Sequence, residues 1–241
     1  MKASFIIVNY QSDKYLAKCI SSIKEKGLGV DHEIIVVNNN PANLEVELLG
    51  EIKLINKGKN VGYGAGCNAG AKLAQGEILC FLNPDTEIIS ENISDIIKKF
   101  NENKNIGAIG PKLLMEDGKT QWWCAGKDFN LWQLFKNNLG IIDSKKIWES
   151  EKEILTDWVS GAALFVQKEI FDKIGGFDEN YFMYAEDMDL CRRIRNAGYK
   201  VLYCPEFVVL HRGGKSRDNI FKQKIQFFKS SLYYLKKWLK G

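Results

Sequence analysis

Proline, histidine and long apolar runs are scarce in this sequence of 241 residues. It holds four prolines, two histidines and 21 scattered glycines, which excludes a collagen-like repeat and a low-complexity linker. With 45% hydrophobic and 27% charged residues, the composition excludes an intrinsically disordered chain and predicts a globular one. No stretch of about 18 apolar residues occurs, and the first eight residues lack the features of a signal peptide. We therefore expect a cytoplasmic protein whose first residues form a strand.

Cysteine and histidine form no local cluster, and no C-x-x-C pair is present. This spacing argues against a zinc site or a disulfide framework, and it predicts reduced thiols that serve as small core residues. His32 lies in a polar segment. His211 follows the apolar run 207–210 and precedes two glycines, so it is either a metal ligand or an ordinary surface histidine.

The charge is unevenly distributed along the chain. The net charge is +4, but residues 219–241 contain six lysines and no acidic residue, which leaves 28 basic and 30 acidic residues elsewhere. The body is thus slightly acidic, which argues against a nucleic-acid-binding face and for a basic attachment segment at the C-terminus. Within that segment Phe221, Ile225, Phe228, Leu232, Leu235 and Leu239 recur at helical spacing. This face either rests on an anionic membrane surface or packs on the body or on a second subunit, with the lysines solvated.

Short apolar runs alternate with helical patterns along the first half of the chain. Strands are expected at 4–9, 33–37, 52–55, 78–82, 107–114, 159–166, 201–203 and 208–211, and helices at 14–26, 68–74, 88–105, 168–174 and 187–197. This order predicts an α/β fold with a mostly parallel, doubly wound sheet flanked by helices. We expect one domain over 1–218 with two abutting halves, at about 1–115 and about 116–218, followed by a basic helix at 219–241.

Three segments carry residues suited to chemistry. Asn83-Pro84-Asp85-Thr86 follows a strand, so Asp85 is either a ligand of Mg²⁺ or Mn²⁺ or a turn-capping carboxylate. Asn60–Gly70 is a glycine-rich turn that resembles a phosphate cradle but departs from the dinucleotide and P-loop patterns. Glu186-Asp187-Met188-Asp189 places three acids at a helix start, where they either complement the helix dipole or include a general base.

Taken in order, these segments resemble a known enzyme family. The resemblance is carried by 5–10, 34–40, 60–70, 82–86, 160–162, 175–179, 186–190 and 211–214. Together they are similar to the family 2 glycosyltransferases of the GT-A fold, in their bacterial rhamnosyltransferase-like branch.

The resemblance implies an inverting, metal-dependent transfer of a sugar from a dTDP- or UDP-sugar to a saccharide or lipid-linked saccharide, in cell-surface polysaccharide biosynthesis. Asp187 matches the catalytic base, and Asp85 and His211 match the residues at the Mg²⁺ or Mn²⁺ ion. The half at about 1–115 would bind the nucleotide-sugar, and the half at about 116–218 would bind the acceptor. The donor would contact Asn9, Tyr10, Asn38, Asn60, Gly62, Asn68 and Asn83. Such enzymes often extend lipid-linked sugars, which suits peripheral attachment to the inner face of the cell membrane.

Two positions depart from the family pattern, and two other functions stay open. Asn38 stands where many members carry Asp, and Cys67 stands where an arginine is common; both concern the nucleotide rather than the reaction. One alternative is a non-catalytic nucleotide-sugar or carbohydrate-binding module on the same fold. The other, a sugar-1-phosphate nucleotidyltransferase, would carry a basic glycine-rich loop after the first strand, where this chain has Asn9–Ser12.

Aromatic residues crowd the irregular stretch 116–157. They either line the acceptor side by stacking on sugar rings or serve as core material. The residues concerned are Trp122, Trp123, Phe129, Trp132, Phe135 and Trp148.

Overall fold

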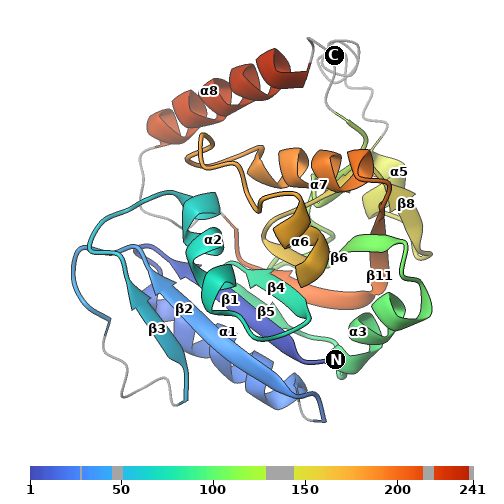
Figure 1. Cartoon of the computed structure of the whole chain (residues 1–241), viewed down its shortest axis with the longest axis horizontal. Helices are drawn as coiled ribbons and strands as arrows, with labels where there is room; N and C mark the ends of the chain where they lie inside the picture. The colour runs from blue at the N-terminus through green and yellow to red at the C-terminus, as the bar shows by residue number, and fades with distance from the viewer. Residues whose placement is uncertain (28, 45–50, 129–143, 214–219, 239–241) are drawn as a thin grey trace.

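The computed structural model describes residues 1–27, 29–44, 51–128, 144–213 and 220–238 and centres on a nine-stranded sheet (Figure 1). The strand order is β3-β2-β1-β4-β10-β6-β11-β5, with β8 beside β11. The strands are β1 (Ala3–Asn9), β2 (His32–Asn38), β3 (Lys53–Asn56), β4 (Ile78–Leu82), β5 (Thr86–Ile88), β6 (Ile106–Leu114), β8 (Ile154–Thr156), β10 (Ala163–Gln167) and β11 (Lys200–His211). A separate two-stranded sheet pairs β7 (Ala125–Gly126) with β9 (Trp158–Val159).

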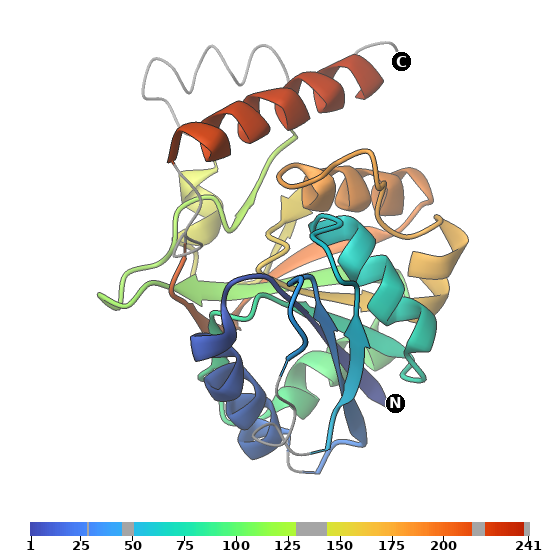
Figure 2. The same cartoon turned by 90° about the vertical axis from the view of Figure 1, so that its left-hand side faces the viewer.

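The helices are α1 (Asp13–Lys26), α2 (Tyr63–Leu73), α3 (Ile93–Glu102), α5 (Lys145–Trp148), α6 (Lys168–Lys173), α7 (Glu186–Asn196) and α8 (Ile220–Trp238). Helices α1 and α3 lie on one face of the sheet, and α2, α6 and α7 lie on the other (Figures 1 and 2). α8 lies beyond α7, at the end of the molecule away from the N-terminus (Figure 2). None of the described helices combines the length and the apolar character needed to span a bilayer.

The first half of the sheet is parallel because its strands are buried on both faces. Every residue of β1 and of β4 is buried, and β1 pairs in parallel with β2 on one side and β4 on the other. Such continuous apolar strands fit a parallel sheet covered by helices on both faces. The expected α/β class with flanking helices is confirmed.

The second half of the sheet is mixed. β10 lies between β4 and β6 and runs antiparallel to both, while β11 runs parallel to β6 and antiparallel to β5 and β8. β10 therefore joins the two halves of the chain into one continuous sheet. After β4, the N–H of Asn83 donates to the Ala162 carbonyl, and the Asp85 carbonyl accepts from the N–H of Arg212.

The prediction of a glycine-rich turn at Asn60–Gly70 is wrong over most of that range, because residues 63–70 belong to α2. The helix begins at Tyr63, not at Asn68. A Cβ added at Gly66 would lie 2.7 Å from Val8 Cγ1, and one at Gly70 would lie 2.5 Å from Ile6 Cγ2. The glycines thus allow α2 to pack closely on β1, and this tertiary contact outweighs the low helix propensity of glycine.

Three other expected elements differ in extent. The helix expected at 88–105 covers only Ile93–Glu102, because Thr86–Ile88 is an edge strand beside β11. The strand expected at 159–166 is two strands, β9 and β10, interrupted at 160–162. The two short strands expected near the end are a single strand, β11, with a register shift between Cys204 and Val208, where Pro205 cannot donate a ladder hydrogen bond.

Candidate active site

A cavity of about 610 Å³ lies where the polar strand ends meet the start of α7. Asn83 and His211 line one part of it, and Glu186 and Asp187 line another. Phe227 of α8 also lines this cavity. The structure therefore brings residues from β4, β11, α7 and α8 together around one space, and the predicted base lies in the same cavity as two of the predicted donor and metal residues.

Asp187 lies in the first turn of α7 and is held by backbone donors. Its Oδ2 accepts a hydrogen bond from the N–H of Gly161 at 2.8 Å, and its Oδ1 accepts one from the N–H of Met188 at 2.8 Å. Burial raises the pKa of Asp187, although these backbone hydrogen bonds oppose the rise. A carboxylate that is fixed in position and more basic than usual suits proton abstraction.

Glu186, beside Asp187, is 6% exposed. Burial raises the pKa of Glu186 to about 8, and the neighbouring Asp187 adds to the rise. Its Oε2 has no hydrogen-bond partner among the residues that the structure describes. Two adjacent carboxyls in one buried place disfavour double ionisation, so the pair holds a proton at higher pH than isolated carboxyls do.

The predicted metal residues lie next to each other at the carboxyl end of β4. His211 Nε2 is 3.4 Å from Asp85 Oδ1 and 3.3 Å from Asn83 Nδ2, while His211 Nδ1 is 2.6 Å from Gln121 Oε1. Gln121 Oε1 can only accept, so His211 Nδ1 donates to it and Nε2 is the nitrogen that faces Asp85 and Asn83. Burial is the largest effect on the pKa of Asp85 and raises it, whereas the hydrogen bond and charge of a protonated His211, a backbone hydrogen bond and Arg212 together lower it, with a net lowering. An ionised carboxylate and an imidazole lone pair are a donor set that fits Mn²⁺ or Mg²⁺.

The predicted donor residues at the ends of β1 and β2 are buried side by side. Asn9 and Asn38 are register partners, and both side chains are fully buried. The Asn38 amide donates to the Ala42 carbonyl at 2.8 Å and to Asn56 Oδ1 at 3.0 Å. Tyr10, the next residue, is only partly buried. Their contact with a nucleotide stays a prediction.

The segment before α2 is shaped by Asn60 and Gly62. Asn60 Oδ1 accepts the N–H of Gly62 at 3.0 Å, and Gly62 has a φ of 90°. A Cβ at Gly62 would lie 2.6 Å from the carbonyl oxygen of Phe182, so both the conformation and the close approach require glycine. Asn39, which the sequence analysis passed over, donates to the Gly62 carbonyl at 3.2 Å and thereby ties β2 to this turn.

Asn68 lies inside α2 and does not line the cavity. Its amide donates to the Phe177 carbonyl and to Glu179 Oε1, each at 2.9 Å, and its Oδ1 accepts from the N–H of Phe177 at 2.9 Å. These bonds connect α2 to the turn after α6. A role for Asn68 in donor binding stays a prediction.

The tryptophans of the aromatic stretch divide between the cavity and the core. Trp122 and Trp123 line the cavity and are 65% and 41% exposed, whereas Trp148 is 1% exposed. Trp158 lines the cavity from a buried position. Phe129, Trp132 and Phe135 lie outside the described residues. Aromatic faces suited to stacking on sugars are thus present at the cavity, alongside core tryptophans.

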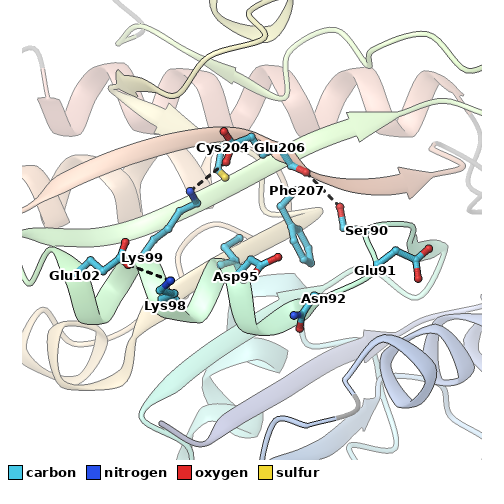
Figure 3. Close-up of a pocket in the computed structure, with 11 residues that line it drawn as sticks. Ser90, Glu91, Asn92, Asp95, Lys98, Lys99, Glu102, Cys204, Glu206 and Phe207 are labelled. Carbon is cyan, nitrogen blue, oxygen red and sulfur yellow. Dashed lines mark hydrogen bonds and ion pairs between the residues drawn. The ribbon is translucent and has the colours of Figure 1, made fainter.

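A second cavity of about 360 Å³ lies between α3 and β11 (Figure 3). Near it, the oxygen and sulfur atoms of Glu153, Cys204 and Glu206 lie close enough to hold an ion. The Lys99 ammonium already forms ion pairs with both glutamates. The burial of Lys99 lowers its pKa and these acids raise it more, with a net rise. A cation of the chain itself thus already lies between the two carboxylates, and this cluster is separate from the predicted metal residues.

Two residues at the cavity were missed by the sequence analysis. Gln121 orients His211, and the Tyr63 hydroxyl donates to the Gly161 carbonyl at 2.6 Å, next to the backbone N–H that binds Asp187. Gln121 lies outside every motif, whereas Tyr63 lies within the Asn60–Gly70 segment but was not singled out there. Each acquires its role from a contact with a distant part of the chain, which sequence spacing does not record.

Comparison with known proteins identifies the family. Residues 4–167 match the model of glycosyl transferase family 2, and residues 154–212 match that of the N-terminal domain of galactosyltransferase. The rhamnosyltransferase WbbL of Escherichia coli K12 is 26% identical over 95% of this chain and 91% of its own length. An N-acetylglucosaminyl-diphospho-decaprenol L-rhamnosyltransferase of Mycobacterium tuberculosis is 28% identical over 71% of this chain and 62% of its own length.

Solved structures share the fold at low sequence identity. GalNAc-T7 with UDP, GalNAc and Mn²⁺ superposes with a TM-score of 0.69 at 15% identity, over 99% of this chain and 48% of that one. The mannosyltransferase PcManGT of Pyrobaculum calidifontis, with GDP-Man and Mn²⁺, gives a TM-score of 0.64 at 15% identity, over 96% and 64%. The family model covers most of this chain and the fold agrees with it, so the chain belongs to glycosyl transferase family 2 and is a glycosyltransferase of the GT-A fold.

Proposed function

We propose that this enzyme transfers a sugar, with inversion, from a nucleoside-diphosphate sugar to a hydroxyl of a saccharide or lipid-linked saccharide during cell-surface polysaccharide synthesis. One observation carries the proposal: a half-buried Asp187 of raised pKa lines the same cavity as Asn83 and His211. An inverting transfer needs a base on one side of the sugar centre and support for the leaving group on the other. The rhamnosyltransferase relatives support a rhamnosyl or related hexosyl donor.

Asp187 is the base in this proposal. It takes the proton of the acceptor hydroxyl as the oxygen attacks the anomeric carbon, and the bond from that carbon to the diphosphate breaks in the same step. The N–H groups of Gly161 and Met188 hold the carboxylate in place before and after the proton arrives. A positioned base typically contributes roughly 10²–10⁴-fold to the rate.

Asp85 and His211 would hold a divalent ion, Mg²⁺ or Mn²⁺. When bound, such an ion offsets the negative charge that grows on the departing diphosphate. Gln121 orients the His211 ring by accepting a hydrogen bond from Nδ1. The amide nitrogen of Asn83 lies 3.3 Å from Nε2 of the same ring. The Mn²⁺ in the structures of GalNAc-T7 and PcManGT supports this assignment.

The donor would lie along the carboxyl ends of β1, β2 and β4. Asn9, Tyr10, Asn38, Asn60, Gly62 and Asn83 stand at or near these ends, and ligands of open α/β sheets bind in such a crevice. The nucleotide of the donor is dTDP or UDP in this proposal. The acceptor would enter past Trp122 and Trp123, whose exposed rings are available to stack on sugar rings.

We also propose that the enzyme works on the inner face of the cell membrane and binds it peripherally through α8. Ile225, Phe228 and Leu232 are 42%, 61% and 49% exposed, and the exposed lysines of the same helix lie among them. Exposed apolar side chains on a lysine-rich helix without acids suit the boundary between anionic headgroups and acyl chains. A lipid-linked acceptor would then be presented close to the cavity, which Phe227 of the same helix lines.

The test is a panel of nucleotide-sugars with Mn²⁺ or Mg²⁺, read first by thermal shift and then by release of the nucleoside diphosphate. A specific donor raises the melting temperature by mass action. Metal-dependent release of the diphosphate, increased by an acceptor, is the expected result. A donor that binds but never turns over with any acceptor would favour the non-catalytic module.

A further inference from the structure

The start of α7 follows a conformation that few residues adopt. Tyr184 and Ala185 have φ values of 70° and 65°, in the left-handed region, and Glu186 and Asp187 come directly after them. Side-chain-bearing residues persist there only where surrounding contacts hold them. The direction in which Asp187 enters the cavity therefore depends on what holds the turn before it.

α8 holds this turn on one side. The Ser230 hydroxyl is buried and donates to the Met183 carbonyl at 2.6 Å, and the Phe227 ring packs edge-on against Tyr184 with ring centres 5.8 Å apart. On the other side, the N–H of Tyr63 donates to the Phe182 carbonyl at 3.0 Å. The turn is thus bound between α2 and α8.

Helix α8 also contacts α7 through Asp189. This carboxylate is fully buried; its Oδ1 accepts from Trp238 Nε1 at 2.9 Å and lies 2.7 Å from the Lys237 ammonium, and its Oδ2 accepts from Arg193 at 2.8 Å. Lys237 also lies 2.7 Å from Asp178 Oδ2, at the start of the segment that leads to the turn. Charge-assisted hydrogen bonds to a buried carboxylate are strong and directional.

The residues that make these contacts recur along one side of α8, from Phe227 through Ser230 and Tyr233 to Lys237. The exposed apolar residues Ile225, Phe228 and Leu232 lie on another side. The contacts with the turn and with Asp189 are therefore separate from the face proposed to meet the membrane. This separation allows the two roles of α8 to be tested by different substitutions.

We infer that Ser230, Lys237 and Trp238 form a clamp that positions Asp187, so that α8 is part of the catalytic apparatus. Ser230 fixes the backbone just before the left-handed turn, and Lys237 and Trp238 fix the helix just after Asp187 through Asp189. This inference rests on the proposed role of Asp187 as the base. The three are positioning residues, because none of them lines the cavity.

The test compares Ser230→Ala, Lys237→Met and Trp238→Phe in the full chain with the control Lys18→Met. Lys18 is exposed on α1 and does not line the cavity. Amide hydrogen exchange over residues 182–188 should become about tenfold faster in the three clamp variants and stay unchanged in the control. The value of kcat should fall about tenfold or more while the donor KM stays within about twofold, because small misplacements of a catalytic group lower turnover strongly. Lys237→Arg, in contrast to Lys237→Met, should keep the exchange rate and the kcat of wild type.

Unchanged exchange in the clamp variants overturns the inference, whatever the activity. Faster exchange with unchanged kcat also overturns it, since α8 would then only support the fold. The exchange measurement does not depend on the role of Asp187. If Asp187→Asn kept wild-type activity, the assignment of Asp187 as the base would fail, and faster exchange in the clamp variants would still show that α8 holds the turn.

Discussion

Asp187 Oδ2 accepts a hydrogen bond from the backbone N–H of Gly161 at 2.8 Å, which joins the start of α7 to the gap between β9 and β10. The contact places a half-buried carboxylate at the cavity wall with its orientation set by the backbone. It also explains why the strand expected at 159–166 is interrupted at this point: the amide of Gly161 serves Asp187 rather than a neighbouring strand.

Asp187→Asn tests the proposed base. Asparagine has the same shape, and its one carbonyl oxygen can accept the hydrogen bond of either Gly161 or Met188 but not of both. It cannot take up the proton. We expect the transfer rate to fall by about 10²-fold or more, with donor affinity retained in calorimetry. Asp172→Asn, an exposed change on α6, is the control. A wild-type rate in Asp187→Asn would assign Asp187 to the capping of α7 and leave Glu186 as the candidate.

Asp85→Ala tests the metal site with a readout besides activity. Loss of the carboxylate beside His211 should weaken Mn²⁺ binding, measured by titration calorimetry with the nucleoside diphosphate present, by at least about tenfold, and should abolish transfer. The exposed Asp95→Ala provides a control of the same chemistry. Full activity of Asp85→Ala in the presence of a chelator would rule out a metal at this position.

Glu186→Gln tests the pH dependence that burial imposes. The pKa of Glu186 is about 8 in the folded chain and near 4.5 in an unfolded one. Between these values the folded chain keeps a proton that the unfolded chain has released, so the free energy of unfolding falls as pH rises. Glutamine carries no such proton, so the free energy of unfolding of Glu186→Gln does not fall with pH for this reason. In denaturant titrations, the difference in free energy of unfolding between Glu186→Gln and wild type should therefore grow from about pH 5 to about pH 8. A pH-independent difference, as expected for the exposed Glu25→Gln, would contradict the buried pair.

Gly62→Ala tests the turn before α2. Both Gly62 and Gly58 have positive φ, but a Cβ at Gly62 would meet the Phe182 carbonyl, whereas one at Gly58 meets nothing within 4 Å. Gly58→Ala should cost only the conformational strain, about 1–2 kcal/mol. Gly62→Ala should cost clearly more and lower donor affinity. An equal decrease in the free energy of unfolding for the two variants, measured with urea, would mean that the close approach of Gly62 to Phe182 is unimportant.

The exposed face of α8 is tested by liposome co-sedimentation. A triple Ile225→Ser, Phe228→Ser, Leu232→Ser variant should lose binding to anionic vesicles at low salt, because the apolar insertion is removed. The control replaces three exposed apolar residues elsewhere, Leu73, Ile89 and Leu155, with serine. Binding by wild type should weaken as salt rises. If wild type does not sediment with vesicles, or the triple variant binds equally, the face serves another partner.

The predicted apolar face of α8 is exposed in part, and its lysines are not all solvated. Ile225, Phe228 and Leu232 are exposed, whereas Leu235 is half-buried, and contact of this face with a membrane stays a prediction. Leu239 lies outside the described residues. Lys237 is not simply solvated, since it lies 2.7 Å from both Asp178 and Asp189. Sequence spacing identifies a helix face, whereas the partner of each lysine depends on what folds against it.

The sequence by itself determined the parallel half of the fold and the family. Apolar runs that are buried on both faces need helices around them, and the order of short motifs from Phe5 to Gly214 matches one enzyme family. It also supplied the residue types for chemistry, because a carboxylate after a strand-ending proline and acids at a helix start are visible in one dimension.

Only the tertiary structure decided which of these residues meet. His211 lies beside Asp85 because β11 pairs with β5, and Gln121 orients His211 from a distant loop. Ser230 and Lys237 of α8 contact the segment that precedes Asp187. The glycines of α2 form a helix because β1 offers a close surface. The physical reason is common to all of these: hydrogen bonds, ion pairs and close packing act between atoms near in space, and sequence spacing records only neighbours along the chain.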